Sequence, residues 1–186
     1  MIFEWDELNL MREEARRIMS LPPAERKKQK DKYCDYLEFV LCLVYGYGWR
    51  EAEKVVGIVP FKDGLDDICV NLEIENKTFR QRAEEYLADE NATEAEMIRL
   101  IDTESVRDYN TGVIDAGKAS GMLGVRKRWN TMMDGRVRET HDYLHGMEVG
   151  LNDRFYTFDG DSADAPGGFT LPENNINCRC WVTLQT

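Results

Sequence analysis

The feature that most constrains the fold is an abrupt change of sequence pattern after Gly124. Before this point, apolar residues recur at intervals of three and four, which is the period of an α-helix with one buried face. After it, short apolar segments alternate with turn residues, and from Met147 onward Gly, Asn, Asp and Pro dominate. We therefore predict an α+β protein, with a mainly helical N-terminal lobe and a small C-terminal α+β module.

The first 60 residues predict a helical start. Apolar residues from Leu8 to Ile18 recur at helical spacing before Pro22 and Pro23 interrupt the pattern, and a second helix is marked by the segment 36–44. The glycines in 45–48 indicate a loop or kink. A short helix is then predicted over 49–56, closed by a glycine.

Further helical segments are predicted over 65–72 and 79–87. Thr93 and Glu96 have the spacing of a capping box and start a long helix that ends between Gly117 and Gly121. We place the boundary between two lobes within 87–93. The helical lobe then covers residues 1–90 and the C-terminal region covers 91–186.

The C-terminal module is expected to combine one helix with short strands. Large residues in 125–132 favour a strand, and a helix is predicted from Gly135 to His145. Two further short strands, over 155–158 and 180–184, are expected to pair across the turn-rich loops.

Composition excludes several classes of protein. The net charge of −11 and the pI of about 4.7 argue against a protein whose main task is direct nucleic-acid binding, since phosphate contacts need Lys and Arg. Acidity is concentrated in residues 1–120, with 26 acidic and 17 basic residues out of totals of 35 and 24. The longest apolar run, 39–45, is too short to cross a membrane, for which about 20 residues are needed.

The N-terminus and the cysteines suggest the compartment. The first residues are acidic at once and no apolar stretch of a signal peptide follows, so we expect a cytoplasmic protein. Five cysteines, an odd number, argue against a framework of disulfides. Cys34, Cys42 and Cys69 lie among apolar residues and are interpreted as small core residues.

A group of charged residues supplies the inventory of a hydrolase or transferase site. It contains a candidate general base, an acid and cations that would stabilise an oxyanion, namely Glu104, Asp134, Arg136, Arg138, Glu139 and His141. Helical spacing would place Asp134, Arg138 and His141 on one face. The structural alternative is that these side chains form ion pairs that hold a loop-rich fold together.

Two histidines and two cysteines have the types and number of a zinc site. His141 and His145 lie one helical turn apart, and Cys178 and Cys180 point to the same side of a strand. A metal bound there would stabilise the loop-rich module, which is a structural role. The alternative is that the two cysteines are a buried pair that anchors the last strand, because a disulfide closing so small a ring is strained.

A compound motif in the second half of the chain resembles one family. Its elements are Trp129, Asp134, Arg136, Arg138, His141 and Gly146, then Phe155, a turn at 166–168 and a terminal Asn-Cys-Arg-Cys at 177–180, preceded by the helix that contains 99–112. Over roughly residues 93–186, the chain resembles the phage Mu F-like family of phage head morphogenesis (minor head) proteins.

This resemblance implies a protein of a phage or prophage that acts in capsid assembly. The implied partners are the portal, the major capsid protein or the scaffold, and the implied locations are the host cytoplasm and the assembled phage head. The resemblance requires no cofactor, and the structural zinc considered above is a separate hypothesis drawn from the residue types. The alternative is a small toxin-like effector enzyme that uses the Arg, His and Glu cluster.

Overall fold

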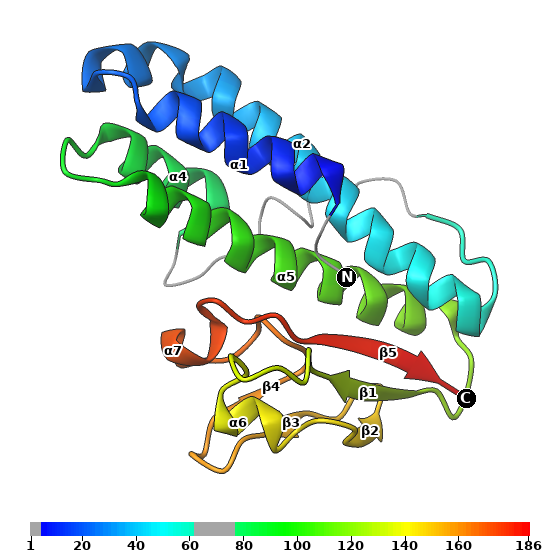
Figure 1. Ribbon diagram of the computed structural model, residues 1–186. Coiled ribbons are helices and arrows are strands. Elements are labelled where there is room, and N and C mark those ends of the chain that lie inside the picture. The colour runs from blue at the N-terminus through cyan, green and yellow to red at the C-terminus, as the bar shows by residue number, and fades with distance from the viewer. Residues whose placement is uncertain (1–4, 62–76) are drawn as a thin grey trace. The chain divides into compact units, whose positions relative to one another are not determined.

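The computed structural model of the protein describes residues 5–61 and 77–186 (Figure 1). The helices are α1 (Asp6–Met19), α2 (Pro23–Val56), α4 (Phe79–Ala88), α5 (Glu94–Ser120), α6 (Glu139–Asp142) and α7 (Pro172–Asn175). The strands are β1 (Arg126–Asn130), β2 (Glu148–Gly150), β3 (Phe155–Tyr156), β4 (Ser162–Ala163) and β5 (Trp181–Gln185). Helices followed by short antiparallel strands confirm the predicted α+β class.

The chain divides into two compact units that are not consecutive in sequence. Unit 1 contains residues 1–43 and 62–105, and unit 2 contains residues 44–61 and 106–186. The long helices α2 and α5 each contribute one end to each unit. The boundary predicted at 90/91 falls inside unit 1, between α4 and α5.

Unit 1 is a group of helices around one apolar core. In Figure 1, α1 lies beside α2 and α4 lies beside α5. Each helix buries one stripe of apolar residues, as the spacing predicts. Fully buried members of this core include Met11, Ala15, Ile18, Cys34, Leu37, Phe79, Ala83, Leu87, Met97 and Ile101.

Two of these helices begin at capping boxes. At α4, the Thr78 hydroxyl accepts a hydrogen bond from the Gln81 N–H, and the Gln81 side chain accepts from the Thr78 N–H. At α5, Thr93 and Glu96 form the same reciprocal pair, as the sequence predicted. Each box satisfies N–H groups that have no partner inside the helix.

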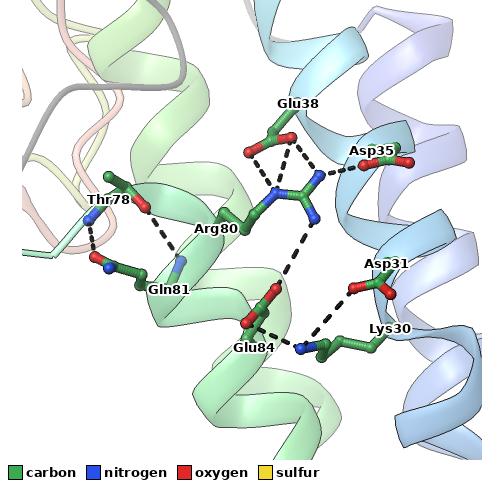
Figure 2. Close-up of polar contacts among 8 residues, drawn as sticks. All are labelled: Lys30, Asp31, Asp35, Glu38, Thr78, Arg80, Gln81 and Glu84. Carbon is green, nitrogen blue, oxygen red and sulfur yellow. Dashed lines mark hydrogen bonds and ion pairs between the residues drawn. The ribbon is translucent and has the colours of Figure 1, made fainter.

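Arg80 joins α4 to α2 in the same unit (Figure 2). Its guanidinium donates to the Glu38 carboxylate, with the closest contact at 2.7 Å, and also to Asp35. Beside it, Lys30 on α2 forms an ion pair of 3.1 Å with Glu84 on α4. The apolar core of unit 1 is thus bordered by charged contacts between two helices distant in sequence.

Of the two alternatives predicted for residues 45–48, a loop or a kink, the loop is wrong, because α2 runs without interruption through Gly46 and Gly48. The reason is a close approach of two backbones. A Cβ atom on Gly48 would lie 1.9 Å from the carbonyl oxygen of Tyr109, and one on Gly112 would lie 2.1 Å from that of Tyr45. These glycines therefore serve helix packing and not a turn.

Unit 2 places a small sheet against the C-terminal half of α5 (Figure 1). The strands are ordered β2-β1-β5, and both pairs are antiparallel. A Cβ on Gly117 of α5 would meet the side chains of Leu184 and Leu151 at 2.9 and 3.1 Å. Alternation along β1 directs Lys127 and Trp129 toward the buried side.

Two expectations for the C-terminal module need correction. The helix predicted from Gly135 to His145 covers only Glu139–Asp142, flanked by turns. The segment 155–158 does not pair with 180–184, since β3 pairs with β4 and β5 pairs with β1. At 155–156, pairing with the nearby β4 replaces the expected pairing with the more distant segment 180–184.

Of the three cysteines interpreted as small core residues, the structure describes two. Cys34 is fully buried, and burial raises the pKa of its thiol to about 12. Cys42 is half-buried, whereas Cys69 and the helix predicted over 65–72 lie outside the described residues. Within 5–61 and 77–186, no helix combines the length and the apolar character needed to cross a lipid bilayer.

Candidate functional site

Three of the predicted metal ligands lie together in unit 2. The ligand atoms of His141, Cys178 and Cys180 all lie within 4.8 Å of one another. The Nδ1 atom of His141 is 3.5 Å from each of the two sulfur atoms. The side chains are buried, with exposed fractions of 1%, 5% and 3%. Among the described residues, this is the one group of three such side chains within reach of a shared ion.

Local backbone geometry explains how both sulfurs reach the same side. In extended chain, alternate residues point in opposite directions, so Cys178 and Cys180 face inward while Arg179 faces outward. Asn177 turns the chain from α7 into this segment with φ at 57°, a conformation that Asn tolerates better than most residues.

Asn110 on α5 holds the beginning of β5. It is fully buried, its Oδ1 accepts from the Val182 N–H at 2.8 Å, and its Nδ2 donates to the Cys180 carbonyl at 3.4 Å. The same amide donates to the Pro166 carbonyl at 3.3 Å. One side chain thus fixes the position of Cys180 relative to α5.

Aromatic rings surround the imidazole. The ring of His141 stacks on Phe169 at 5.2 Å between centroids and meets the edge of Trp129 at 5.5 Å. Trp129 also contacts Phe155 at 5.1 Å. The rings restrict the orientation of the imidazole, whose Nε2 has no hydrogen-bond partner among residues 5–61 and 77–186.

The two thiols have opposite pKa shifts. A hydrogen bond from Cys180, with a further contribution from His141, lowers the pKa of Cys178 well below its ordinary value. The hydrogen bond to Cys178 and burial raise the pKa of Cys180. The hydrogen bond between the two thiols thus shifts their pKa values in opposite directions.

Asp134 and Arg179 form a bidentate ion pair at 2.6 and 2.8 Å. This pair lowers the pKa of Asp134 to about 2. Arg136 is also near the carboxylate, at 3.5 Å, but its side chain is 81% exposed. Asp134 is therefore joined to the Cys178–Cys180 segment and not to Arg138, with which it was expected to share a helix face.

Arg138 binds backbone oxygens. Its guanidinium donates to the carbonyls of Glu173, in α7, and Ile176, which follows it; the second distance is 2.5 Å. These carbonyls lie where α7 ends, so the cation satisfies acceptors that the helix itself leaves open. Arg138 thus ties the segment carrying His141 to the segment that leads to Cys178.

Glu104 pairs with a residue of its own unit. It lies in unit 1, where its two oxygens each accept from a nitrogen of Arg82 at 2.9 Å, and its side chain is only 3% exposed. Glu139 is the first residue of α6 and is exposed. Of the charged candidates, Asp134 pairs with Arg179, Arg138 binds backbone carbonyls and Glu104 pairs with Arg82.

His145 does not belong to the group of three. Its Nδ1 lies 3.1 Å from the backbone N–H of Thr131 and 3.1 Å from the hydroxyl of the same residue. The short helix explains the difference, since α6 ends at Asp142 and His145 lies in the following turn.

Sequence reasoning missed the residues that organise the loops. Asp161 is buried and accepts from the N–H groups of Ser162, Thr170 and Leu171 and from the amide of Asn174. In the sequence, Asn110 and Arg179 stood out only as members of the motif elements at 99–112 and 177–180. A polar residue within an apolar helix face, as at Asn110, is a signal that can be recognised in advance.

Comparison with known proteins identifies the family to which the chain belongs. The chain belongs to the Phage Mu protein F like family, whose model matches residues 73–183. It is 29% identical over 108 residues to NAD(+)--arginine ADP-ribosyltransferase EFV of Enterococcus faecalis, a match covering 57% of this chain and 22% of that protein. It is also 29% identical over 65 residues to Minor head protein GP7 of Bacillus phage SPP1, covering 35% of this chain and 21% of that protein.

The matched stretches thus span about a fifth of each of these two relatives. No solved structure matches the chain.

Proposed function

We propose that this protein is a minor head protein of a phage or prophage that acts in head assembly through contacts with other proteins. The observation that carries the proposal is the family match over residues 73–183. Similarity to a phage minor head protein points the same way. The hydrogen bonds that Asp134, Arg138 and Glu104 make with other groups of the chain also favour a structural role over catalysis.

The partners we propose are the portal, the major capsid protein or the scaffold. The protein would be made in the host cytoplasm and become part of the phage head. Its net charge of −11 favours basic surfaces on such partners over direct contact with DNA.

The test is recovery of the protein with heads. A tagged chain is expressed in cells that produce the phage, heads are isolated, and bound proteins are identified by mass spectrometry. We expect the protein in the head fraction and portal, capsid or scaffold protein in the affinity eluate. Normal heads from a deletion strain, with no head component in the eluate, would contradict the proposal.

A second candidate is a small effector enzyme, a hydrolase or transferase, that uses Arg136, Arg138, His141 and either Glu104 or Glu139. The similarity to an arginine ADP-ribosyltransferase favours it, although the match covers 22% of that protein. Incubation with labelled NAD+ and arginine-rich acceptor proteins tests this candidate. Transfer of label that His141→Ala abolishes without unfolding would establish an enzyme.

The same substitutions separate the two candidates. In an assembly protein, His141→Ala and Arg138→Ala should reduce folding and solubility, because both side chains connect segments of the loop-rich module. In an enzyme, the fold should persist while activity is lost. Circular dichroism and soluble yield measure the first result.

A further inference from the structure

We propose that His141, Cys178 and Cys180 bind one zinc ion, through Nδ1 of the histidine and the two cysteine sulfurs. This inference goes beyond the role in head assembly and does not depend on it. It assigns a metal to a cluster that is buried in unit 2.

The distances fit a shared ion. Zn–N bonds of about 2.0–2.1 Å and Zn–S bonds of about 2.3 Å at tetrahedral angles place nitrogen and sulfur about 3.5 Å apart. Both distances from His141 Nδ1 to the sulfurs of Cys178 and Cys180 are 3.5 Å. One ion can therefore bind all three atoms without a large rearrangement.

The ligand chemistry selects zinc over hard cations. Thiolate sulfur and imidazole nitrogen suit Zn²⁺, whereas Ca²⁺ and Mg²⁺ take oxygen ligands. Two thiolates also carry two negative charges into a buried site, which is costly without compensation. A divalent cation with a neutral histidine brings the total charge of the group to zero.

The ligands are held in place from two sides. Arg138 joins the His141 segment to the backbone around α7, and Asp134 pairs with Arg179, which lies between the two cysteines. Hydrogen bonds from Asn110 fix the start of β5. Arg138 and Asp134, two of the charged residues that suggested catalysis, thus position the segments that carry the ligands.

Three protein ligands leave one tetrahedral position of the ion open to a further ligand. His145 is directed to Thr131, and the described residues offer no fourth His, Cys, Asp or Glu within this group. The ion joins α6, which carries His141, to the segment that leads into β5. Its role is structural, because unit 2 consists largely of loops and short strands in this region.

The test uses full-length protein without a metal-binding tag, purified under reducing conditions. Native mass spectrometry and elemental analysis should report one zinc per chain. Cys178→Ser and Cys180→Ser should lose it or weaken binding at least tenfold in a competition with a chromogenic chelator. Cys34→Ala, which removes a buried thiol of unit 1, is the matched control and should keep one zinc.

A second measurement covers the case in which the cysteine variants fail to fold. Cobalt(II) added to metal-free wild-type protein should produce the ligand-field absorption of a tetrahedral site together with a thiolate-to-cobalt charge-transfer band. A chain that neither contains zinc nor shows these bands would overturn the proposal. A metal-free chain with a disulfide between Cys178 and Cys180, recognised by a mass about 2 Da lower, would overturn it as well.

Discussion

At the scale of single residues, unit 2 depends on polar side chains that are buried among apolar ones. Lys127 and Asp161 are both buried but differ in their hydrogen bonding. Lys127 is fully buried, lies 5.6 Å from the centre of the Phe155 ring, and its Nζ has no hydrogen-bond partner among the described residues. Asp161 is surrounded by donors. The first residue should reduce stability and the second should increase it.

Lys127→Met should stabilise the protein at pH 7. Burial lowers the pKa of Lys127 to about 8. An unfolded lysine has a pKa of about 10.4, so the unfolded chain binds more protons between these values and wild-type stability rises across that window. We expect a gain of about 1–3 kcal/mol at pH 7.

Thermal unfolding at pH 7 and pH 10.5 measures this effect. The advantage of the methionine variant should be largest below pH 8 and should shrink toward pH 10.5. The exposed Lys27→Met is the control and should change little at either pH. A Lys127 variant that is less stable at pH 7 would show that the ammonium group makes a favourable contact.

Asp161→Ala should destabilise the protein by about 2–4 kcal/mol, because it leaves buried N–H groups without acceptors. Although burial alone raises the pKa of Asp161, hydrogen bonds from Asn174 and from backbone N–H groups lower it below the ordinary value. The carboxylate therefore contributes stability above about pH 3.9, and the contribution is lost as the pH falls below it.

Urea unfolding at pH 7 and at pH 3 tests this expectation, and the difference between wild type and Asp161→Ala should be smaller at pH 3. Asp164→Ala is the matched control, since its side chain is 59% exposed. Equal effects of the two substitutions would contradict the role assigned to Asp161.

At the scale of elements, the contact between α2 and α5 in unit 2 depends on glycines. Gly48 and Gly112 each lie against a carbonyl oxygen of the other helix. Alanine normally stabilises a helix relative to glycine, by roughly 0.5–1 kcal/mol. Here the tertiary contact reverses that preference, because the backbones approach too closely for a methyl group.

Gly48→Ala should therefore destabilise the protein by about 1–3 kcal/mol or more, as overpacking forces the two helices apart. Gly46→Ala, two residues away in the same helix, is the control. Among the described residues, its Cβ would meet one atom, of Phe61, at 3.9 Å, so Gly46→Ala should stabilise by roughly 0.5–1 kcal/mol. Chemical unfolding measures the free energy of unfolding of both variants. A stabilising Gly48→Ala would contradict the close approach of the two backbones.

At the scale of the whole molecule, the long helices α2 and α5 each contribute residues to both compact units. Unit 1 also contains a buried ion pair between two of its helices. Glu104, on α5, pairs with Arg82 on α4 while both side chains are largely removed from water. Replacing one partner leaves a charge without its counter-ion, which costs far more than the loss of an exposed pair.

Glu104→Gln should lower the free energy of unfolding by about 3–5 kcal/mol. Hydrogen exchange should show the largest loss of protection in α4 and the first half of α5. The control is Glu85→Gln on α4, whose ion pair with Lys77 is exposed and should be worth about 1 kcal/mol or less. A Glu104→Gln protein with unchanged stability and unchanged exchange would contradict the structural role assigned to this residue.

The sequence by itself determined the elements whose signals are local. The helix α1, the capping box at Thr93, the end of α5 near Gly121 and the strand around Trp129 were all predicted, because apolar periodicity and terminal residues act within a few positions of the chain. The motif in the second half also indicated the family, which the match over residues 73–183 shows.

Only the tertiary structure decided the features that depend on distant segments. Gly48 looked like a turn signal until α5 was placed against it, and Asp134 pairs with Arg179, 45 residues away, instead of sharing a helix with Arg138. His141 meets Cys178 and Cys180, whereas His145 does not. Local propensity is worth tenths of a kcal/mol per residue, so buried ion pairs and close packing between distant segments override it.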